Sequence, residues 1–129
     1  MSLPTTALHG LHEELGGRLV DFAGWELPVQ FAGIIAEHQH TRKSASLFDV
    51  SHMGQVLIYP ESGNLADAAA ALETLIPASV AGLKEGRQRY GLFTDETGGV
   101  LDDLMFANHG DRYFLVVNAA RSDHDLGLL

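Results

Sequence analysis

Residues 88–118 read QRYGLFTDETGGVLDDLMFANHGDRYFLVVN, and this stretch decides the fold of the chain. It contains strand-like runs at 88–94, 100–108 and 112–118. The linkers between the runs, DETGG and HGD, have the length and the composition that are typical of β-hairpins. The stretch therefore predicts an antiparallel meander of three strands.

Helices and further strands are expected before and after this meander. The most regular helical pattern begins at Asn64, a typical N-cap residue, and is stopped by Pro77. Other helices are expected at 5–15, at 32–46 and from Ser122 onward, and other strands at 18–22, 27–31, 47–50 and 54–59. Together these elements predict an α+β fold with a single domain over residues 1–129.

The composition argues against several classes of protein. Lys and Arg number 8 against 17 Asp and Glu, which gives a formal net charge of −9. Affinity for nucleic acid comes largely from basic side chains, and no apolar stretch approaches the ~20 residues of a membrane span. The absence of cysteine excludes disulfides and thiolate catalysis. Because no targeting segment is seen, we expect a cytoplasmic protein that binds neither nucleic acid nor membranes.

The seven histidines do not form a recognisable metal motif. His38 and His40 are two residues apart, a spacing that separates side chains on a helix, and no HExxH motif is present. Histidines on a solvated helix surface are the better interpretation, and no metal site is predicted. Ser51 next to His52 is no sign of a catalytic triad, because a nucleophile and its base must meet in space.

Asp102 and Asp103 stand side by side in a segment that is apolar on both faces. At least one carboxylate should therefore be desolvated, a condition under which an acid acquires a tuned chemical role. The alternative is that both cap the turn at Gly98-Gly99. Neighbouring strand residues face opposite sides, so the two cannot share a proton, and one of them should face a turn amide or a basic partner.

Several motifs, in one order along nearly the whole chain, resemble the T protein family of the glycine cleavage system, the aminomethyltransferases. The matching stretches are VDFAGWELP at 20–28, Glu37-His38 with Arg42, FDVSHMG at 48–54, YGLFT at 90–94, GGVLDDL at 98–104 and FLVVNAA at 114–120. The resemblance implies the N-terminal part of a folate-binding domain, with βαβ-type units and antiparallel sheet.

The resemblance also implies an enzyme with a defined reaction. The aminomethyl group on the lipoyl arm of the H protein is split, ammonia leaves, and the methylene passes to the co-substrate tetrahydrofolate. Family members are longer, so the chain is expected to be an N-terminal fragment. It then lacks later Tyr, Glu and Arg contributors to the site and is inactive alone.

Residues of the family site can be carried over position by position. Asp103 matches the key acidic residue, which would orient the attacking amine and stabilise the positive charge that forms as ammonia departs. The positions that match the folate pocket are Met53, Leu57, Tyr90, Met105, Val116 and Asn118. Ala107 stands where many members carry a larger side chain, so a contact there is not expected.

Two other functions compete with this interpretation. One is the folate domain of a flavin-dependent sarcosine or dimethylglycine oxidising enzyme, in which a flavin domain comes first; here the motifs begin close to the N-terminus. The other is a non-catalytic folate-binding module. We also expect an open sheet edge at 112–118 and a broken last helix, and therefore self-association of the chain.

Overall fold

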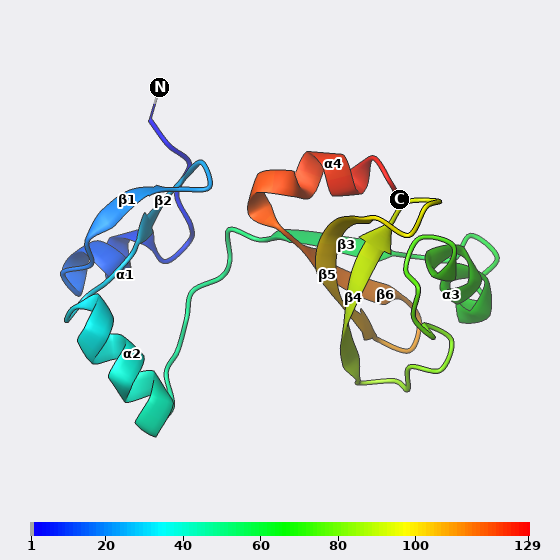
Figure 1. Ribbon diagram of the computed structural model, residues 1–129, viewed down its shortest axis with the longest axis horizontal. Coiled ribbons are helices and arrows are strands. Elements are labelled where there is room, and N and C mark those ends of the chain that lie inside the picture. Colours follow the sequence, from blue (N-terminus) through cyan, green and yellow to red (C-terminus); the bar gives the residue numbers. More distant parts are fainter. Residues whose placement is uncertain (1) are drawn as a thin grey trace. The chain divides into compact units, whose positions relative to one another are not determined.

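The computed structural model describes residues 2–129. The chain divides into two compact units, Met1–His52 and Met53–Leu129 (Figure 1). Helices and antiparallel sheet occur together, which confirms the predicted α+β class. The single domain expected over 1–129 stays a prediction.

The first unit begins with helix α1 (His9–Glu14), followed by the hairpin of β1 (Leu19–Phe22) and β2 (Trp25–Pro28). Phe22 pairs with Trp25, so only Ala23 and Gly24 form the turn, and both have positive φ, 53° and 82°. This is the backbone that a two-residue hairpin favours. The second strand therefore begins at Trp25, two residues before the predicted strand.

Helix α2 (Ile34–Lys43) completes the regular structure of this unit and is shorter than the predicted 32–46. Gly33 at φ 118° and Ser44 at φ −148° are both outside the helical region, which fixes the two ends. One carboxylate oxygen of Glu37 accepts hydrogen bonds from the backbone amides of Phe31 at 2.7 Å and Gly33 at 2.9 Å. These bonds lower the pKa of Glu37, and they stabilise the chain where it enters the helix.

The strand predicted at 47–50 is wrong. These residues pair with no other strand, and the side chain of Leu47 is fully exposed. What holds the segment is Asp49, whose Oδ2 accepts from Thr6 Oγ1 at 3.0 Å and lies 3.2 Å from His12 Nε2. A specific polar contact to the start of the chain replaces the sheet partner that a strand needs.

The second unit contains the four-stranded antiparallel sheet and is the part that positions the candidate site. Its strands are β3 (Gly54–Ile58), β4 (Gln88–Thr94), β5 (Val100–Asn108) and β6 (Tyr113–Val117), in the order β3-β6-β5-β4 (Figure 1). The predicted meander is confirmed. The open edge expected at 112–118 is wrong, because β3 pairs with β6 along its whole length and leaves β3 and β4 as the edges.

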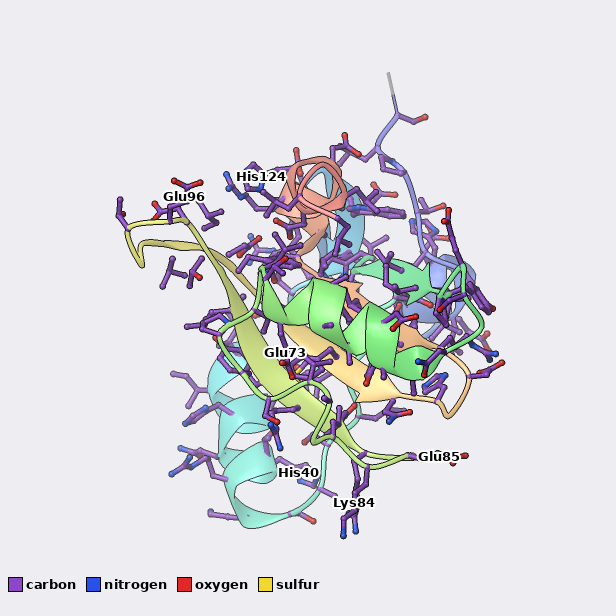
Figure 2. The ribbon with its side chains drawn as sticks, turned by 90° about the vertical axis from the view of Figure 1, so that its right-hand side faces the viewer. His40, Glu73, Lys84, Glu85, Glu96 and His124 are labelled. Atoms are coloured by element: carbon purple, nitrogen blue, oxygen red, sulfur yellow. The ribbon has the colours of Figure 1, made fainter. Side chains whose placement is uncertain are left out.

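Helix α3 (Leu65–Glu73) covers one face of this sheet (Figure 2). The tip of the β4–β5 hairpin is marked by Glu96 in the same view. It begins after Asn64, whose side chain caps it by accepting from the amide of Ala66 at 3.2 Å. The buried core between helix and sheet includes Ala68, Ala69, Leu72, Phe93, Leu104, Phe106, Leu115 and Val117. Every second residue of β6 belongs to this core, and on β5 the alternating residues Leu104 and Phe106 do, as expected for a sheet packed on one side.

After β6 the chain turns through a short 3₁₀ helix (Ala119–Arg121) into α4 (Ser122–Leu126). The helix expected from Ser122 is therefore confirmed. Its start is close to β3: a Cβ on Gly54 would lie 3.1 Å from the Cβ of Ser122. No helix in the part of the chain that the structure describes is long and apolar enough to cross a membrane.

Replacing Phe106 by Ala is expected to lower the free energy of unfolding by about 3–5 kcal/mol, because truncation of a buried ring leaves a cavity. The control is Val100→Ala, since Val100 is 62% exposed on the same strand, and its loss should stay within about 0.5 kcal/mol. Urea denaturation followed by circular dichroism measures both. Equal losses would contradict the assignment of the buried face.

Candidate functional site

The sheet residues that the sequence analysis selected lie on one face of the sheet. We call this the open face: it is the face opposite α3. Leu104 and Phe106 point into the core, so Asp103 and Met105, which alternate with them, point to the open face. Met105 pairs with Tyr90 of β4 on one side and with Val116 of β6 on the other. Three candidate residues from three strands thus form one row across the sheet.

Leu57 extends the open face onto β3. Its neighbours Val56 and Ile58 pack against the core, so its own side chain, 48% exposed, points the other way. Met53 directly precedes β3 and is partly buried. Ala107 follows Met105 on the same side of β5 and adds little bulk there. The open face is therefore an apolar surface that remains accessible over β3 and β4.

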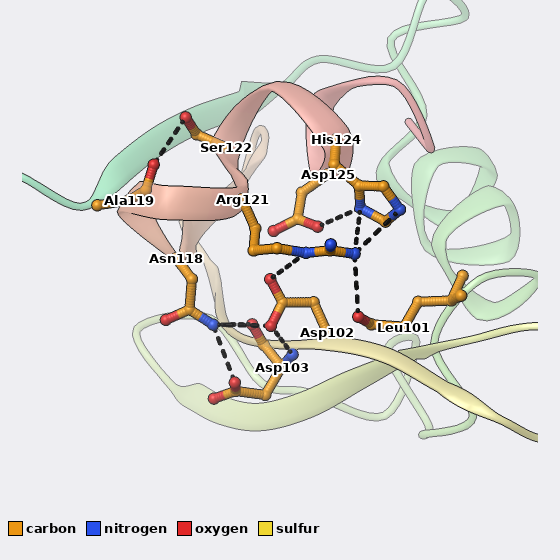
Figure 3. Close-up of polar contacts among 9 residues, drawn as sticks. All are labelled: Leu101, Asp102, Asp103, Asn118, Ala119, Arg121, Ser122, His124 and Asp125. Atoms are coloured by element: carbon orange, nitrogen blue, oxygen red, sulfur yellow. Dashed lines mark hydrogen bonds and ion pairs between the residues drawn. The ribbon is translucent and has the colours of Figure 1, made fainter. Parts of the chain in front are cut away.

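A polar cluster lies at the end of the open face, where β6 ends. Asn118 Nδ2 donates to Asp103 Oδ1 and to Asp102 Oδ1, each at 2.9 Å (Figure 3). The backbone amide of Asp103 also donates to Asp102 Oδ1, at 2.9 Å. Two neighbouring carboxylates thus share one amide donor, and charge-assisted hydrogen bonds of this kind are stronger than neutral ones.

The two aspartates have different surroundings. Asp102 pairs with Phe93, a core residue, so it points to the side of the sheet away from the open face. There Arg121 is its basic partner, with Nε 3.8 Å from Asp102 Oδ2. Burial alone would raise the pKa of Asp102, but the hydrogen bonds from the Asp103 amide and Asn118 outweigh it and lower that pKa.

The alternative role for these aspartates, capping the turn at Gly98-Gly99, is wrong. Asp95 performs it: its Oδ1 accepts from the backbone amides of Thr97 and Gly99, each at 2.8 Å. A hydrogen bond from the Thr97 hydroxyl to the same oxygen, at 2.7 Å, lowers the pKa of Asp95 together with the two amide bonds. Asp102 and Asp103 are therefore free of the turn.

Tyr90 connects the apolar row to the carboxylates. It pairs with Met105, and Asp103 lies diagonally across from it on the same face, within reach of an aromatic side chain. Partial desolvation and the negative charge of Asp103 raise the pKa of the Tyr90 hydroxyl. The hydroxyl remains a neutral hydrogen-bond donor beside Asp103. The open face thus combines a flat apolar row with a carboxylate, an amide and a phenol.

The sequence matches the family described as GCVT N-terminal domain over residues 8–129. The chain belongs to this family. It is 45% identical over 125 residues to the mitochondrial aminomethyltransferase of Dictyostelium discoideum, covering 96% of this chain and 30% of the relative. The aminomethyltransferase of Bacillus subtilis is 46% identical over 125 residues, with coverages of 96% and 33%.

The fold is that of the same family. The crystal structure of glycine cleavage system aminomethyltransferase T from Bartonella henselae superposes with a TM-score of 0.84 at 37% identity, covering 98% of this chain and 35% of that one. The resemblance noted in the sequence to the T protein family is thus confirmed. The chain spans about a third of the length of these relatives.

Residues outside the open face of this GCVT domain concern the serine and the histidines discussed from the sequence, and they correct the expectation of solvated histidines. Ser51 Oγ donates to Asp49 Oδ1 at 2.6 Å. His12 is 5% exposed and faces Asp49, and His9 Nε2 lies 2.7 Å from Glu26, so these histidines are structural rather than solvated. No group of three metal-ligating side chains is found among residues 2–129.

Asp125 and Arg121 are residues of the site in this GCVT domain that no sequence pattern indicated. Asp125 is completely buried, and Arg121 lies beside Asp102. In the sequence Asp125 belongs to a polar helix that also contains Asp123, and no pattern separates the buried aspartate from the exposed one. Only the packing of α4 distinguishes them.

Replacing Asn118 by Ala is expected to lower the free energy of unfolding by about 1–3 kcal/mol, because two partly buried carboxylates lose their common donor. Gln88→Ala is the control, since Gln88 is an exposed polar residue of the same sheet. Chemical denaturation at neutral pH compares them. A loss no larger than that of the control would show that the amide does not stabilise the pair.

Proposed function

We propose that this chain forms the N-terminal part of the folate site of an aminomethyltransferase of the glycine cleavage system. The observation that supports the proposal is the open face: five of the seven site residues taken from the family resemblance, Asp103, Leu57, Tyr90, Met105 and Val116, share that face, and Asn118 lies at its end. The enzyme acts on the aminomethyl group carried by the lipoylated H protein, releases ammonia and passes the methylene to tetrahydrofolate.

The open face suits a flat ring that has polar edges. The apolar row of Tyr90, Met105 and Val116 can pack against the ring, and the Asp103 carboxylate can accept from its N–H groups. Both hydrogen bonds of Asn118 to carboxylates use Nδ2, so this amide has a fixed orientation. Its carbonyl oxygen is then the group left to accept from the ligand.

Tetrahydrofolate supplies the nitrogen atoms that receive the methylene. Asp103 supplies the charge: a carboxylate held in place by Asn118 can orient the attacking amine and stabilise the positive charge that develops as ammonia departs. Because the hydrogen bond precedes the reaction, little reorganisation is needed when that charge appears. This is the role that the family resemblance implies for Asp103.

The relatives favour the transferase over its competitors. The Dictyostelium, Bacillus and Bartonella proteins all carry the name aminomethyltransferase, and none is named as a flavin-dependent oxidising enzyme. The proposal includes the H protein as the partner and the cytoplasm as the compartment. It also includes a contribution to the site from the part of the relatives that this chain does not span.

The decisive experiment compares Asp103→Asn with Asp102→Asn in a full-length enzyme. This can be a chimera in which the chain replaces the matching third of the Bacillus subtilis relative. Asp103→Asn keeps the Oδ1 acceptor but removes the charge, so turnover at saturating folate should fall by roughly 10²–10³, about 2–4 kcal/mol. Asp102→Asn also keeps its Oδ1 acceptor and should leave most of the turnover while lowering the melting temperature.

The two variants are matched because each changes one atom at neighbouring positions. Loss of turnover in Asp102→Asn with normal turnover in Asp103→Asn would mean that the wrong aspartate has been assigned. Normal turnover in both variants would exclude the carboxylate mechanism.

Assayed alone with loaded H protein and tetrahydrofolate, the chain is expected to show no aminomethyl transfer. An open sheet face cannot exclude water from Asp103. The chimera, run in parallel, serves as the positive control for the substrates. Turnover by the chain that matches the chimera would contradict the proposed need for further residues.

A further inference from the structure

Asp125 is a buried acid whose surroundings provide too few partners for a charge. Its side chain is 0% exposed. Oδ1 lies 3.0 Å from His124 Nδ1, but Oδ2 is buried and has no hydrogen-bond partner among residues 2–129. An ionised carboxylate that is buried and half satisfied is costly, and such a group gains by keeping its proton.

Asp102 also has one carboxylate oxygen that lacks a hydrogen-bond donor among the described residues. Its Oδ1 accepts both hydrogen bonds described above, whereas its Oδ2 is buried without a hydrogen-bond partner in the same described range. Arg121 Nε, at 3.8 Å, is beyond hydrogen-bond distance. Figure 3 shows the Asp125 carboxylate on the side of Asp102 that Oδ2 faces. Two acceptor oxygens that meet without a proton repel each other, and one proton between them satisfies both.

The charges around the pair favour a proton on Asp125. Asp125 faces His124 from its own helix and Asp102 from β5, and the charged group of the preceding turn, Arg121, pairs with Asp102. Burial is the main cause that raises the pKa of Asp125; the hydrogen bond with His124 opposes the shift, and the interaction with Asp102 adds to it. The pKa of Asp102 is lowered, as described above. The arrangement therefore has one negative charge, on Asp102, and one neutral acid.

We propose that Asp125 is a positioning residue that stays protonated and donates to Asp102 Oδ2, fixing the carboxylate that in turn holds Asn118 and the Asp103 amide. Each residue positions the next. Helix α4 fixes Asp125, Asp125 fixes the Asp102 carboxylate by donating to Oδ2, and Asp102 Oδ1 accepts from Asn118 Nδ2 and the Asp103 backbone amide. A role of these contacts in catalysis rests on the proposed function. The proton shared by Asp125 and Asp102, and the fixed orientation of the Asn118 amide, do not depend on it.

The test uses two substitutions at Asp125 and one control. Asp125→Asn places an N–H where the acid has its O–H and cannot ionise, so it should preserve the contact to Asp102. Asp125→Ala removes the contact. Asp123→Asn is the matched control, because Asp123 is an exposed aspartate on the same helix.

Carbon-13 NMR of the carboxyl groups of the 129-residue chain gives the first measurement. Asp125 is expected to remain in its acid form at pH values above about 3.9, where an unperturbed aspartate has ionised. Titration of Asp125 at or below that pH would overturn the proposal.

The side-chain amide signals of Asn118 give the second measurement, and they do not depend on any catalytic activity. They should stay close to wild type in Asp125→Asn and Asp123→Asn and shift or broaden in Asp125→Ala. Equal changes in Asp125→Asn and Asp125→Ala, or no change in either, would refute the positioning role. If Asp125→Ala fails to fold, the wild-type titration and the Asn118 signals of Asp125→Asn still decide the proposal.

The dependence of stability on pH gives the third measurement. A group whose pKa is raised on folding stabilises the protein while protonated, and this contribution is lost as the pH rises through the folded pKa. Wild type should therefore lose stability relative to Asp125→Asn as the pH rises. For Asp102, whose pKa is lowered, wild type should lose stability relative to Asp102→Asn as the pH falls. If the stability of wild type relative to each variant changed in the same direction with pH for both aspartates, the assignment of the proton would be contradicted.

Failure of the chimera to catalyse transfer would count against the proposed function alone.

Discussion

One amide nitrogen, Nδ2 of Asn118, holds together the polar part of the open face. It donates to Asp102 on one side of β5 and to Asp103 on the other, so it joins the packed side of the sheet to its accessible side. Asn118 directly follows β6, and its position is set by the pairing of Val117 with Leu104. The register between β5 and β6 thus fixes the site, because any other register would move the amide away from both carboxylates.

Local signals were sufficient to predict most of the fold. The meander at 88–118 was predictable because its linkers have the length and composition of hairpins, and the start of α3 because Asn64 caps it; the helix ends at Glu73, before the Pro77 that the sequence suggested as its limit. The segment 47–50 was not, since its apolar residues resemble a strand while its actual support is a hydrogen bond from Thr6, 43 residues away. Nor did the sequence reveal that β3 would pair with β6 and close its edge.

The candidate site was predictable in part. The alternation of side chains on β5 placed Asp102 and Asp103 on opposite faces, and the family motifs selected Asp103. Asp125 was not predictable, because its burial depends on how α4 packs, and exposed and buried aspartates look alike in a polar helix. The alternation on one strand excludes a proton shared between Asp102 and Asp103. No pattern in the sequence relates Asp102 to an acid 23 positions later.

On β5 the number of residues matters as much as their identity, because successive side chains point to opposite faces of the sheet. Core residues and open-face residues occupy successive positions from Asp103 to Ala107, so folding and ligand contact are encoded in the same nine-residue strand. Deletion or insertion of one residue there would exchange the two sets, turning Leu104 outward and burying a carboxylate. Substitutions on this strand can thus change one property at a time, whereas a frame-preserving loss of a single codon would abolish both. The tolerance of the domain to length variation must therefore lie in its loops.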